Sequence, residues 1–176
     1  RQRQMCIRDS LYDVKIYVTT NTLIYENEVE DFISYLKFLY LNGVDAVIMQ
    51  DIGMMSLARK IVPNLEIHAS TQGNNCNDDT LKLYNELGVS RVVLARELSL
   101  EQINGLKTNI EKEVFIHGAL CICYSGCCLF SSLNGGRSGN RGECAGPCRL
   151  PYTLIKNNKI VKTNGNFLLS TKELNT

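Results

Sequence analysis

The stretch from Asp45 to Gln72, DAVIMQDIGMMSLARKIVPNLEIHASTQ, decides the fold, because it holds a complete strand–helix–strand unit. Its first residues, DAVIMQD, form a short apolar run typical of a buried strand. The next segment, GMMSLARKIVP, has helical spacing and is closed by Pro63. The segment LEIHASTQ then indicates a second buried strand. Two buried strands joined by a helix predict a parallel βαβ unit.

The same alternation continues on both sides of this unit. Three more strands are expected at 14–22, 91–97 and 113–120, and helices at 27–44, 78–89 and 99–110. The strand starts near residues 14, 45, 66, 91 and 113 are spaced as in successive βα units. An open doubly wound sheet and a (β/α)8 barrel both fit this pattern. Since a full barrel needs about 250 residues, the sequence predicts a partial TIM-type barrel.

The pattern also predicts where the domains begin and end. Residues 1–10, RQRQMCIRDS, carry no strand or helix period and are interpreted as a non-native or disordered leader. Residues 11–149 are expected to form the partial barrel domain and to end in a cysteine-rich loop. Residues 150–176 are expected to begin a β-rich extension, with a β-hairpin turning at Asn157 and Asn158. The last residues show no helix cap, which favours a truncated chain.

Composition limits the classes of function. The 176 residues carry 19 basic and 18 acidic side chains, so the net charge is +1 and no overall field attracts nucleic acid. No apolar run of 18 residues exists, so no membrane partner is expected. The first residues lack the apolar core of a secretory signal. The expected location is therefore the cytoplasm.

Polar side chains follow nearly every predicted strand. In a parallel barrel the active site forms at the carboxyl ends of the strands, so these residues are the candidate site. The candidate catalytic residues are His68, Gln72, Arg96 and His117. The candidate substrate-binding residues at strand ends are Asn21, Gln50, Ser70, Thr71 and Glu97. A polar residue at a strand end is also what plain solvent exposure would produce.

Six of the eight cysteines lie between His117 and Arg149, in HGALCICYSGCCLFSSLNGGRSGNRGECAGPCR. Disulfide-rich chains are usually small and secreted, so metal binding is the better interpretation. Thiolates suit zinc or an iron–sulfur cluster, and the long, irregular, glycine-rich spacing favours a 4Fe–4S cluster over zinc. Arg137 and Arg141 add a basic, glycine-rich strip that is suited to binding an anionic substrate.

The stretch EVFIHGALCICYSGCCLFS, from Glu113 to Ser131, resembles the signature of the collagenase-like peptidase family U32. The matching positions are Glu113, Phe115, Gly118, Ala119, Leu120, Cys121, Gly126, Cys128 and Ser131. Phe130 departs from the pattern, which has an aliphatic residue there. The likeness extends through HASTQ and RVVLARELS upstream, and through RGECAGPCRLPY and LLSTKEL downstream.

The resemblance implies a (β/α) barrel within a longer chain, and two different activities. One is peptidase activity. The other belongs to relatives with a 4Fe–4S cluster that hydroxylate a tRNA uridine, an rRNA cytidine or a ubiquinone precursor without oxygen. Prephenate is the implied hydroxyl source in the RNA reactions. Three implied cluster ligands match Cys121, Cys128 and Cys144. The position of the fourth implied ligand is occupied by Asn175 in this sequence. The fourth ligand is therefore expected to be Cys148 or a residue beyond the chain.

No His-Glu-x-x-His helix and no Gly-x-Ser-x-Gly elbow is present. A Cys–His pair of His117 and Cys121 remains open, but a cluster would consume Cys121. Of the two activities that the resemblance implies, RNA hydroxylation is therefore the one expected, with Arg96 pairing with a carboxylate such as that of prephenate. The alternatives are a collagenase-like peptidase and a non-catalytic iron–sulfur module. tRNA, bound through regions outside the chain, and a further subunit are the expected macromolecular partners.

Overall fold

A computed structural model describes residues 12–163, 165–171 and 173–175. The chain divides into two compact units, one ending at Val114 and one beginning at Phe115. The predicted boundary after residue 149 lies inside the second unit, so the cysteine-rich segment groups with the residues that follow it. The predicted leader, residues 1–10, lies outside the described residues.

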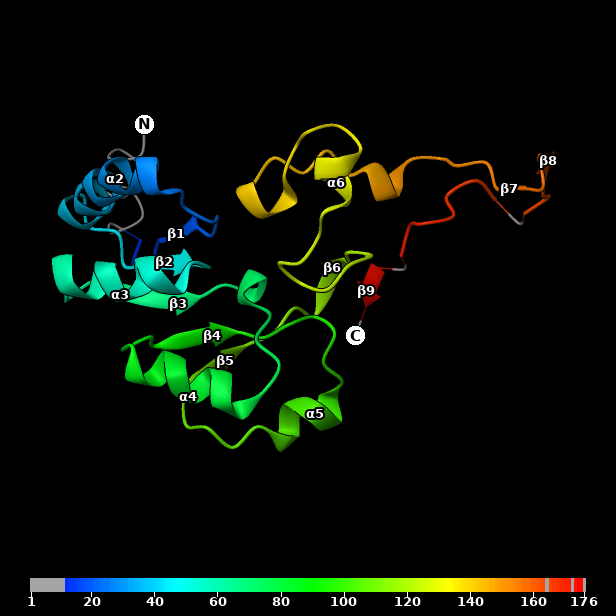
Figure 1. The fold of residues 1–176 in the computed structure, drawn as a ribbon. Helices are drawn as coiled ribbons and strands as arrows, with labels where there is room; N and C mark the ends of the chain where they lie inside the picture. Colours follow the sequence, from blue (N-terminus) through cyan, green and yellow to red (C-terminus); the bar gives the residue numbers. More distant parts are fainter. Residues whose placement is uncertain (1–11, 164, 172, 176) are drawn as a thin grey trace. The chain divides into compact units, whose positions relative to one another are not determined.

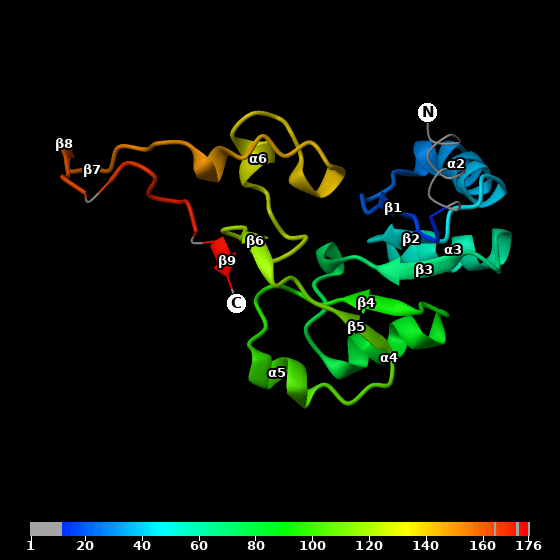
Figure 2. The ribbon, with the colours of Figure 1, turned by 180° about the vertical axis from the view of Figure 1, so that it is seen from behind.

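The first unit is built on a five-stranded parallel sheet (Figures 1 and 2). Its strands stand in chain order: β1 (Tyr17–Thr20), β2 (Ala46–Met49), β3 (Glu66–Ala69), β4 (Arg91–Val93) and β5 (Glu111–Glu113). A doubly wound sheet reverses its strand order at a switch point, whereas no reversal occurs among these five strands. The parallel α/β fold is therefore confirmed, and closure into a barrel stays a prediction.

Helices connect the successive strands (Figure 1). They are η1 (Glu26–Glu28), α2 (Val29–Leu41), α3 (Ile52–Ile61), η2 (Thr71–Gly73), α4 (Asp78–Glu86) and α5 (Leu100–Gly105). The Asp51 carboxylate caps α3 by accepting the N–H of Met54. Ser99 and Gln102 form a capping box at the start of α5. Such caps satisfy backbone N–H groups that have no partner within the helix.

Asn77 occupies the N-cap position of α4, and its side chain accepts the N–H of Thr80. Asp78 binds elsewhere. Its carboxylate accepts the backbone N–H groups of Lys107 and Thr108. These bonds, the Lys107 bond first, lower the pKa of Asp78 to about 2. Asp78 thus ties the start of α4 to the loop that precedes β5.

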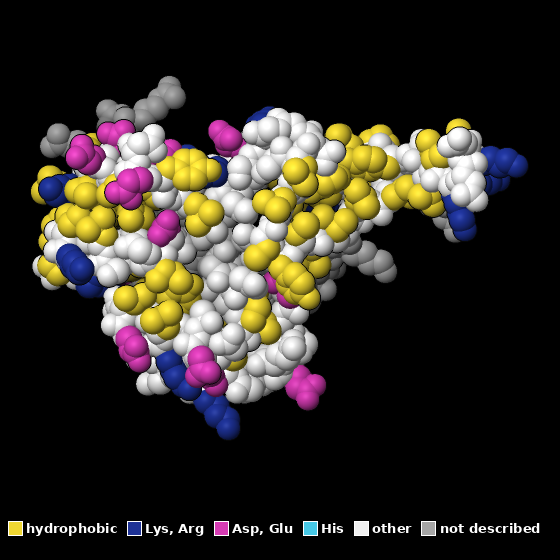
Figure 3. Space-filling model, in the orientation of Figure 1, with side chains coloured by type: hydrophobic (Ala, Val, Ile, Leu, Met, Phe, Trp, Pro, Cys, Tyr) yellow, Lys and Arg dark blue, Asp and Glu magenta, His cyan; other side chains and the backbone are white. Residues whose placement is uncertain are grey.

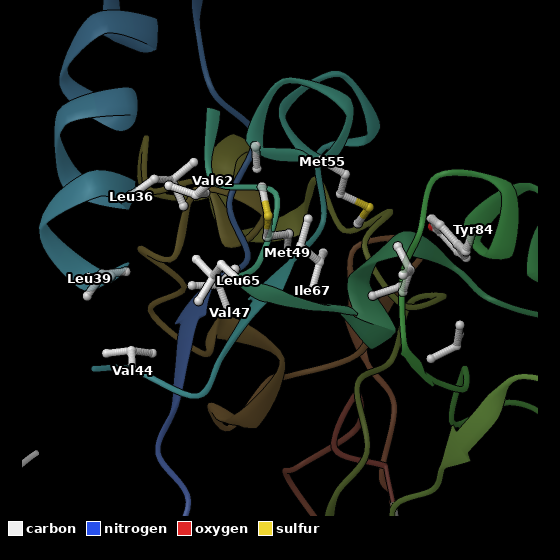
Figure 4. Close-up of a cluster of buried hydrophobic side chains, with 14 of the residues drawn as sticks. Leu36, Leu39, Val44, Val47, Met49, Met55, Val62, Leu65, Ile67 and Tyr84 are labelled. Atoms are coloured by element: carbon white, nitrogen blue, oxygen red, sulfur yellow. The ribbon is translucent and has the colours of Figure 1, made fainter. Parts of the chain in front are cut away.

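The core of the first unit lies between the sheet and its helices (Figure 4). Leu36 and Leu39 of α2 and Met55 of α3 are fully or almost fully buried. From the strands, Val47, Met49, Ile67, Ala69 and Val92 join the same cluster. Burying such side chains contributes roughly 1.5–3 kcal/mol each for those of valine size or larger. This core is what fixes the strand register.

The predicted strand 113–120 is corrected by the structure. It is two strands: β5 ends at Glu113, and β6 (His117–Ala119) belongs to another sheet. The register of β5 pairs Arg91 with Glu111 and Val93 with Glu113. Polar residues could form this strand because Arg91 forms ion pairs with both glutamates. His117 therefore does not lie at the carboxyl end of the fifth parallel strand.

In the second unit, β6 pairs antiparallel with β9 (Glu173–Asn175). Between them lie α6 (Phe130–Leu133), η3 (Gly139–Arg141), η4 (Pro147–Arg149), β7 (Ile155–Lys156) and β8 (Lys159–Ile160). The predicted hairpin is confirmed, since β7 and β8 pair across Asn157 and Asn158, which have φ of 50° and 57°. Two positive φ values are the mark of a type I′ turn. No helix in the described part of the chain is long and apolar enough to cross a membrane.

Candidate functional site

Two faces of the parallel sheet carry different side chains. Val47, Met49, Ile67 and Ala69 pack in the core beneath the helices. Side chains alternate along a strand, so Glu66 and His68 lie on the opposite face. There the ring of His68 meets the ring of Tyr17 edge-on, with centroids 4.8 Å apart. Nε2 of His68 lies 3.5 Å from Oε2 of Glu66.

Arg91 extends this polar face toward β5. Its guanidinium donates to Glu111 at 2.9 Å and to Glu113 at 3.3 Å. The same group lies 5.2 Å from the centroid of the Tyr17 ring, within range of a cation–π contact. Side chains from β1, β3, β4 and β5 therefore form one continuous polar network on the face away from the helices.

His68 is the most buried titratable member of this network, with 1% of its surface exposed. Burial lowers the pKa of His68 below its usual value, and the Arg91 charge lowers it further, while Glu66 offsets part of the shift. Its Nδ1 atom is buried without a hydrogen-bond partner among the described residues. A neutral imidazole with one unpaired nitrogen is able to accept a hydrogen bond from a ligand or to take up a proton.

Two predicted glutamines share this feature with His68. Oε1 of Gln50 and Oε1 of Gln72 are both buried and lack a hydrogen-bond partner within the described chain. Ile48 is in register with His68, so Gln50, two residues later, belongs to the same face as His68. Buried polar atoms are normally paired. These three atoms are therefore the best indication of a ligand site in the first unit.

The remaining predicted residues of the first unit have mixed roles. Asn21 donates to Oγ of Ser70 at 3.4 Å, which links the ends of β1 and β3. Ser70 also caps η2, and Thr71 donates its hydroxyl to the carbonyl of Leu94. Arg96, three residues after the end of β4, is half-buried, and Glu97 is exposed.

Asn75 was missed by the sequence analysis and holds this region together. It is fully buried, and its Nδ2 donates to the carbonyl of Ser70 at 2.8 Å and to that of Val93 at 2.7 Å. It therefore joins the turn after β3 to the end of β4. The sequence offered only a weak signal, a pair of asparagines after a glycine, which predicts a turn and says nothing about burial.

The cysteine-rich segment gathers several of its thiols in the second unit. Burial raises the pKa of Cys123, a hydrogen bond with Cys128 adds to the shift, and the nearby Cys121 and Cys148 contribute further. Among the predicted ligands, Cys121, Cys128 and Cys148 thus lie within electrostatic range of one thiol. Cys144 is exposed, and its sulfur accepts the N–H of Gly146.

Thiolates are the usual ligands of an iron–sulfur cluster, so the chemistry of this donor set fits such a group. The side chains are not already arranged as a cage, since no three His, Cys, Asp or Glu residues of the described chain converge to hold a metal ion.

Hydrogen bonds hold the segments that carry these cysteines. Arg149, directly after Cys148, donates to the carbonyl of Leu120, directly before Cys121. The same guanidinium donates to Ser170 and to the carbonyl of Thr171. Arg149 is thus a structural clamp, whereas Arg137 is exposed and Arg141 is half-buried in η3. His117 is exposed and stands opposite Asn175 in the register of β6 and β9.

The chain is thus an α/β protein in which a parallel sheet is followed by a segment rich in cysteine. The model of Peptidase family U32 matches residues 3–176, and the chain belongs to that family. A solved structure described as the U32 peptidase Mk0906 has the same fold over 66% of this chain and 51% of its own, with a TM-score of 0.58 and 12% identity.

Several named relatives are similar in sequence. The 23S rRNA 5-hydroxycytidine synthase of Escherichia coli is 43% identical over 164 residues, which cover 92% of this chain and 25% of that protein. The tRNA hydroxylation protein P of Escherichia coli is 41% identical, covering 80% of this chain and 32% of that protein. The Collagenase of Porphyromonas gingivalis is 33% identical, covering 93% and 42%. The chain therefore spans less than half the length of these relatives.

Proposed function

We propose that this chain is part of an RNA-hydroxylating enzyme that modifies a pyrimidine base without oxygen. The observation that carries the proposal is the similarity of about 40% identity to proteins named for rRNA and tRNA hydroxylation. The grouped thiols of the second unit support it, because hydrolysis of a peptide bond has no evident need for them.

The proposed cofactor is a 4Fe–4S cluster held by Cys121, Cys128, Cys144 and Cys148. Such a cluster supplies electron transfer or an open iron site when bound. Cys123 is an added candidate, because its thiol forms a hydrogen bond with that of Cys128 and lies near Cys121 and Cys148. The chain's own contribution is to hold these thiols, and Arg149 does so by joining the segments on either side.

The proposed hydroxyl source is a carboxylate such as prephenate. On the open face of the sheet, Glu66, Glu111 and Glu113 outnumber Arg91, so that face disfavours an anion. Arg96 follows β4, outside this acidic group. We therefore assign the carboxylate to Arg96. The unpaired acceptor atoms of Gln50, His68 and Gln72 suit a hydroxyl group of the same molecule and not its carboxylate.

The test is an anaerobic assay of purified protein with bulk tRNA and rRNA, with and without prephenate. Hydroxylated pyrimidines are measured by mass spectrometry, and iron and sulfide are measured on the same samples. Cys121→Ser and Cys128→Ser are expected to lose iron and product. Cys76→Ser is the matched control, because Cys76 lies in the first unit, outside the thiol-rich segment. Full product formation by Cys121→Ser would contradict the proposal.

Peptidase activity is the second candidate, favoured by the similarity to the Collagenase of Porphyromonas gingivalis. The same preparations are offered a collagen-derived peptide. Cleavage by the wild type together with no RNA product would replace the first proposal by the second.

A further inference from the structure

The near-zero net charge of the whole chain conceals two units of opposite charge. Residues 1–114 carry 12 Lys and Arg against 16 Asp and Glu, a net charge of −4. Residues 115–176 carry 7 basic and 2 acidic residues, a net charge of +5. The second unit alone therefore has the electrostatic character of a protein that binds a polyanion.

Three of its seven basic residues lie on the β7–β8 hairpin or just after it. Lys156 and Lys159 lie on the two strands, Lys162 follows shortly after, and all three are exposed. Figure 3 shows Lys and Arg side chains at this hairpin and no Asp or Glu beside them on the face in view. Among the residues that the structure describes, none of the three lysines forms an ion pair or donates a side-chain hydrogen bond.

The pairing register makes this arrangement costly for the free protein. Lys156 stands directly opposite Lys159, and like charges directly opposite one another destabilise a β-ladder. This repulsion acts within a hairpin of two residues per strand, which has little stability of its own. Phosphate groups between the two ammonium groups would remove the repulsion.

We propose that the β7–β8 hairpin binds the phosphate backbone of RNA through Lys156, Lys159 and Lys162. The choice of RNA as the polyanion rests on the proposed function. The charge and the pairing register of the hairpin are observed independently of that function. The contacts are to phosphates, so they position the RNA and carry no base specificity. The exposed Ile155 and Ile160 pair on the other face of the hairpin, which leaves the face of Lys156 and Lys159 to the RNA.

The test measures tRNA binding by fluorescence anisotropy at several salt concentrations. Each lysine–phosphate contact contributes about 0.7 to the slope of log K against log salt. The triple variant Lys156→Gln, Lys159→Gln, Lys162→Gln is expected to reduce the slope by about 2 and to weaken binding about 100-fold at 0.1 M salt. Lys159→Gln alone is expected to show about a third of the change in slope.

The matched control is Lys37→Gln, Lys60→Gln, Lys107→Gln. It removes three exposed lysines from the first unit and changes the net charge equally. Equal loss of affinity in the two triple variants would show that total charge matters and the hairpin does not, which overturns the inference. Unchanged binding by the hairpin variant would do the same. Far-ultraviolet circular dichroism checks that each variant is folded.

Two further measurements separate this inference from the proposed function. The hairpin variant should raise the KM for tRNA in the hydroxylation assay and leave kcat unchanged, whereas Cys121→Ser should lose product and still bind tRNA. Salt-sensitive tRNA binding through the hairpin without any hydroxylation would sustain the inference and overturn the proposed function. Binding to phosphatidylserine vesicles but not to tRNA, lost in the hairpin variant, would overturn RNA as the partner.

Discussion

Asn75→Asp tests whether one buried amide holds the candidate site of the first unit. The substitution keeps the size of the side chain and removes both N–H donors, which now bind the carbonyls of Ser70 and Val93 at 2.8 and 2.7 Å. Leaving a buried carbonyl without its donor costs about 1–3 kcal/mol. We therefore expect the free energy of unfolding to fall by about 2–5 kcal/mol at pH 7.

The pH dependence gives a second signature of the same substitution. Burial beside two carbonyl oxygens raises the pKa of the introduced carboxyl, because the charged form is disfavoured and the protonated form donates one hydrogen bond. The folded state then binds more protons than the unfolded state above pH 4 or so. Stability is therefore recovered in part as the pH falls toward 4 and is lost as the pH rises.

Asn77→Asp is the matched control for Asn75→Asp, since it makes the same chemical change two residues away. Asn77 is an exposed N-cap that accepts the N–H of Thr80 at 2.9 Å, and aspartate caps a helix as well as asparagine does. Urea denaturation at pH 7 compares the two variants. The argument fails if the free energies of unfolding of Asn75→Asp and Asn77→Asp differ by less than about 0.5 kcal/mol, which is the usual effect of a surface substitution.

Two further predictions concern the same unit. A Cβ added at Gly73 would lie 2.5 Å from the hydroxyl of the buried Tyr84, so Gly73→Ala should destabilise by about 1–3 kcal/mol. Gly105→Ala, at the last residue of α5 and in open space, should instead stabilise by about 0.4–1 kcal/mol. Thermal unfolding that ranks the two variants in the opposite order would contradict the packing argument. Because burial lowers the pKa of His68, the unfolded state takes up more protons just below pH 6.5, and stability should fall as the pH falls through that value. His68→Gln should weaken this dependence in urea titrations from pH 7.5 to 5.5, whereas the same change at the exposed His117 should leave it in place.

Local chemistry explains which parts of the fold could be predicted. The capping box of Ser99 and Gln102, the stop at Gly43 and the turn at Asn157 and Asn158 depend on a few neighbouring residues. Each of these signals can be read from the chain without knowing its three-dimensional surroundings. The order of strands and helices in the first unit was predictable for the same reason.

The errors arose where a distant partner decides the structure. The apolar run after Glu113 favoured one long strand. Instead, the polar residues Glu111–Glu113 form β5, because Arg91 on the neighbouring strand forms ion pairs with both glutamates. Asn75 lies in a segment of turn residues, and its burial depends on two carbonyls from separate segments, that of Ser70 after β3 and that of Val93 in β4. Neither partner is visible from local spacing.

Net charge shows the same limit and bears directly on function. Taken over the whole sequence, a charge of +1 argued against a nucleic-acid partner. The field near a surface depends on charges within about 10 Å at physiological salt, since more distant ones are screened. The 16 acidic residues of the first unit therefore do not cancel the field at the β7–β8 hairpin merely by belonging to the same chain. Charge becomes informative about a partner only after the chain is divided where its structure divides.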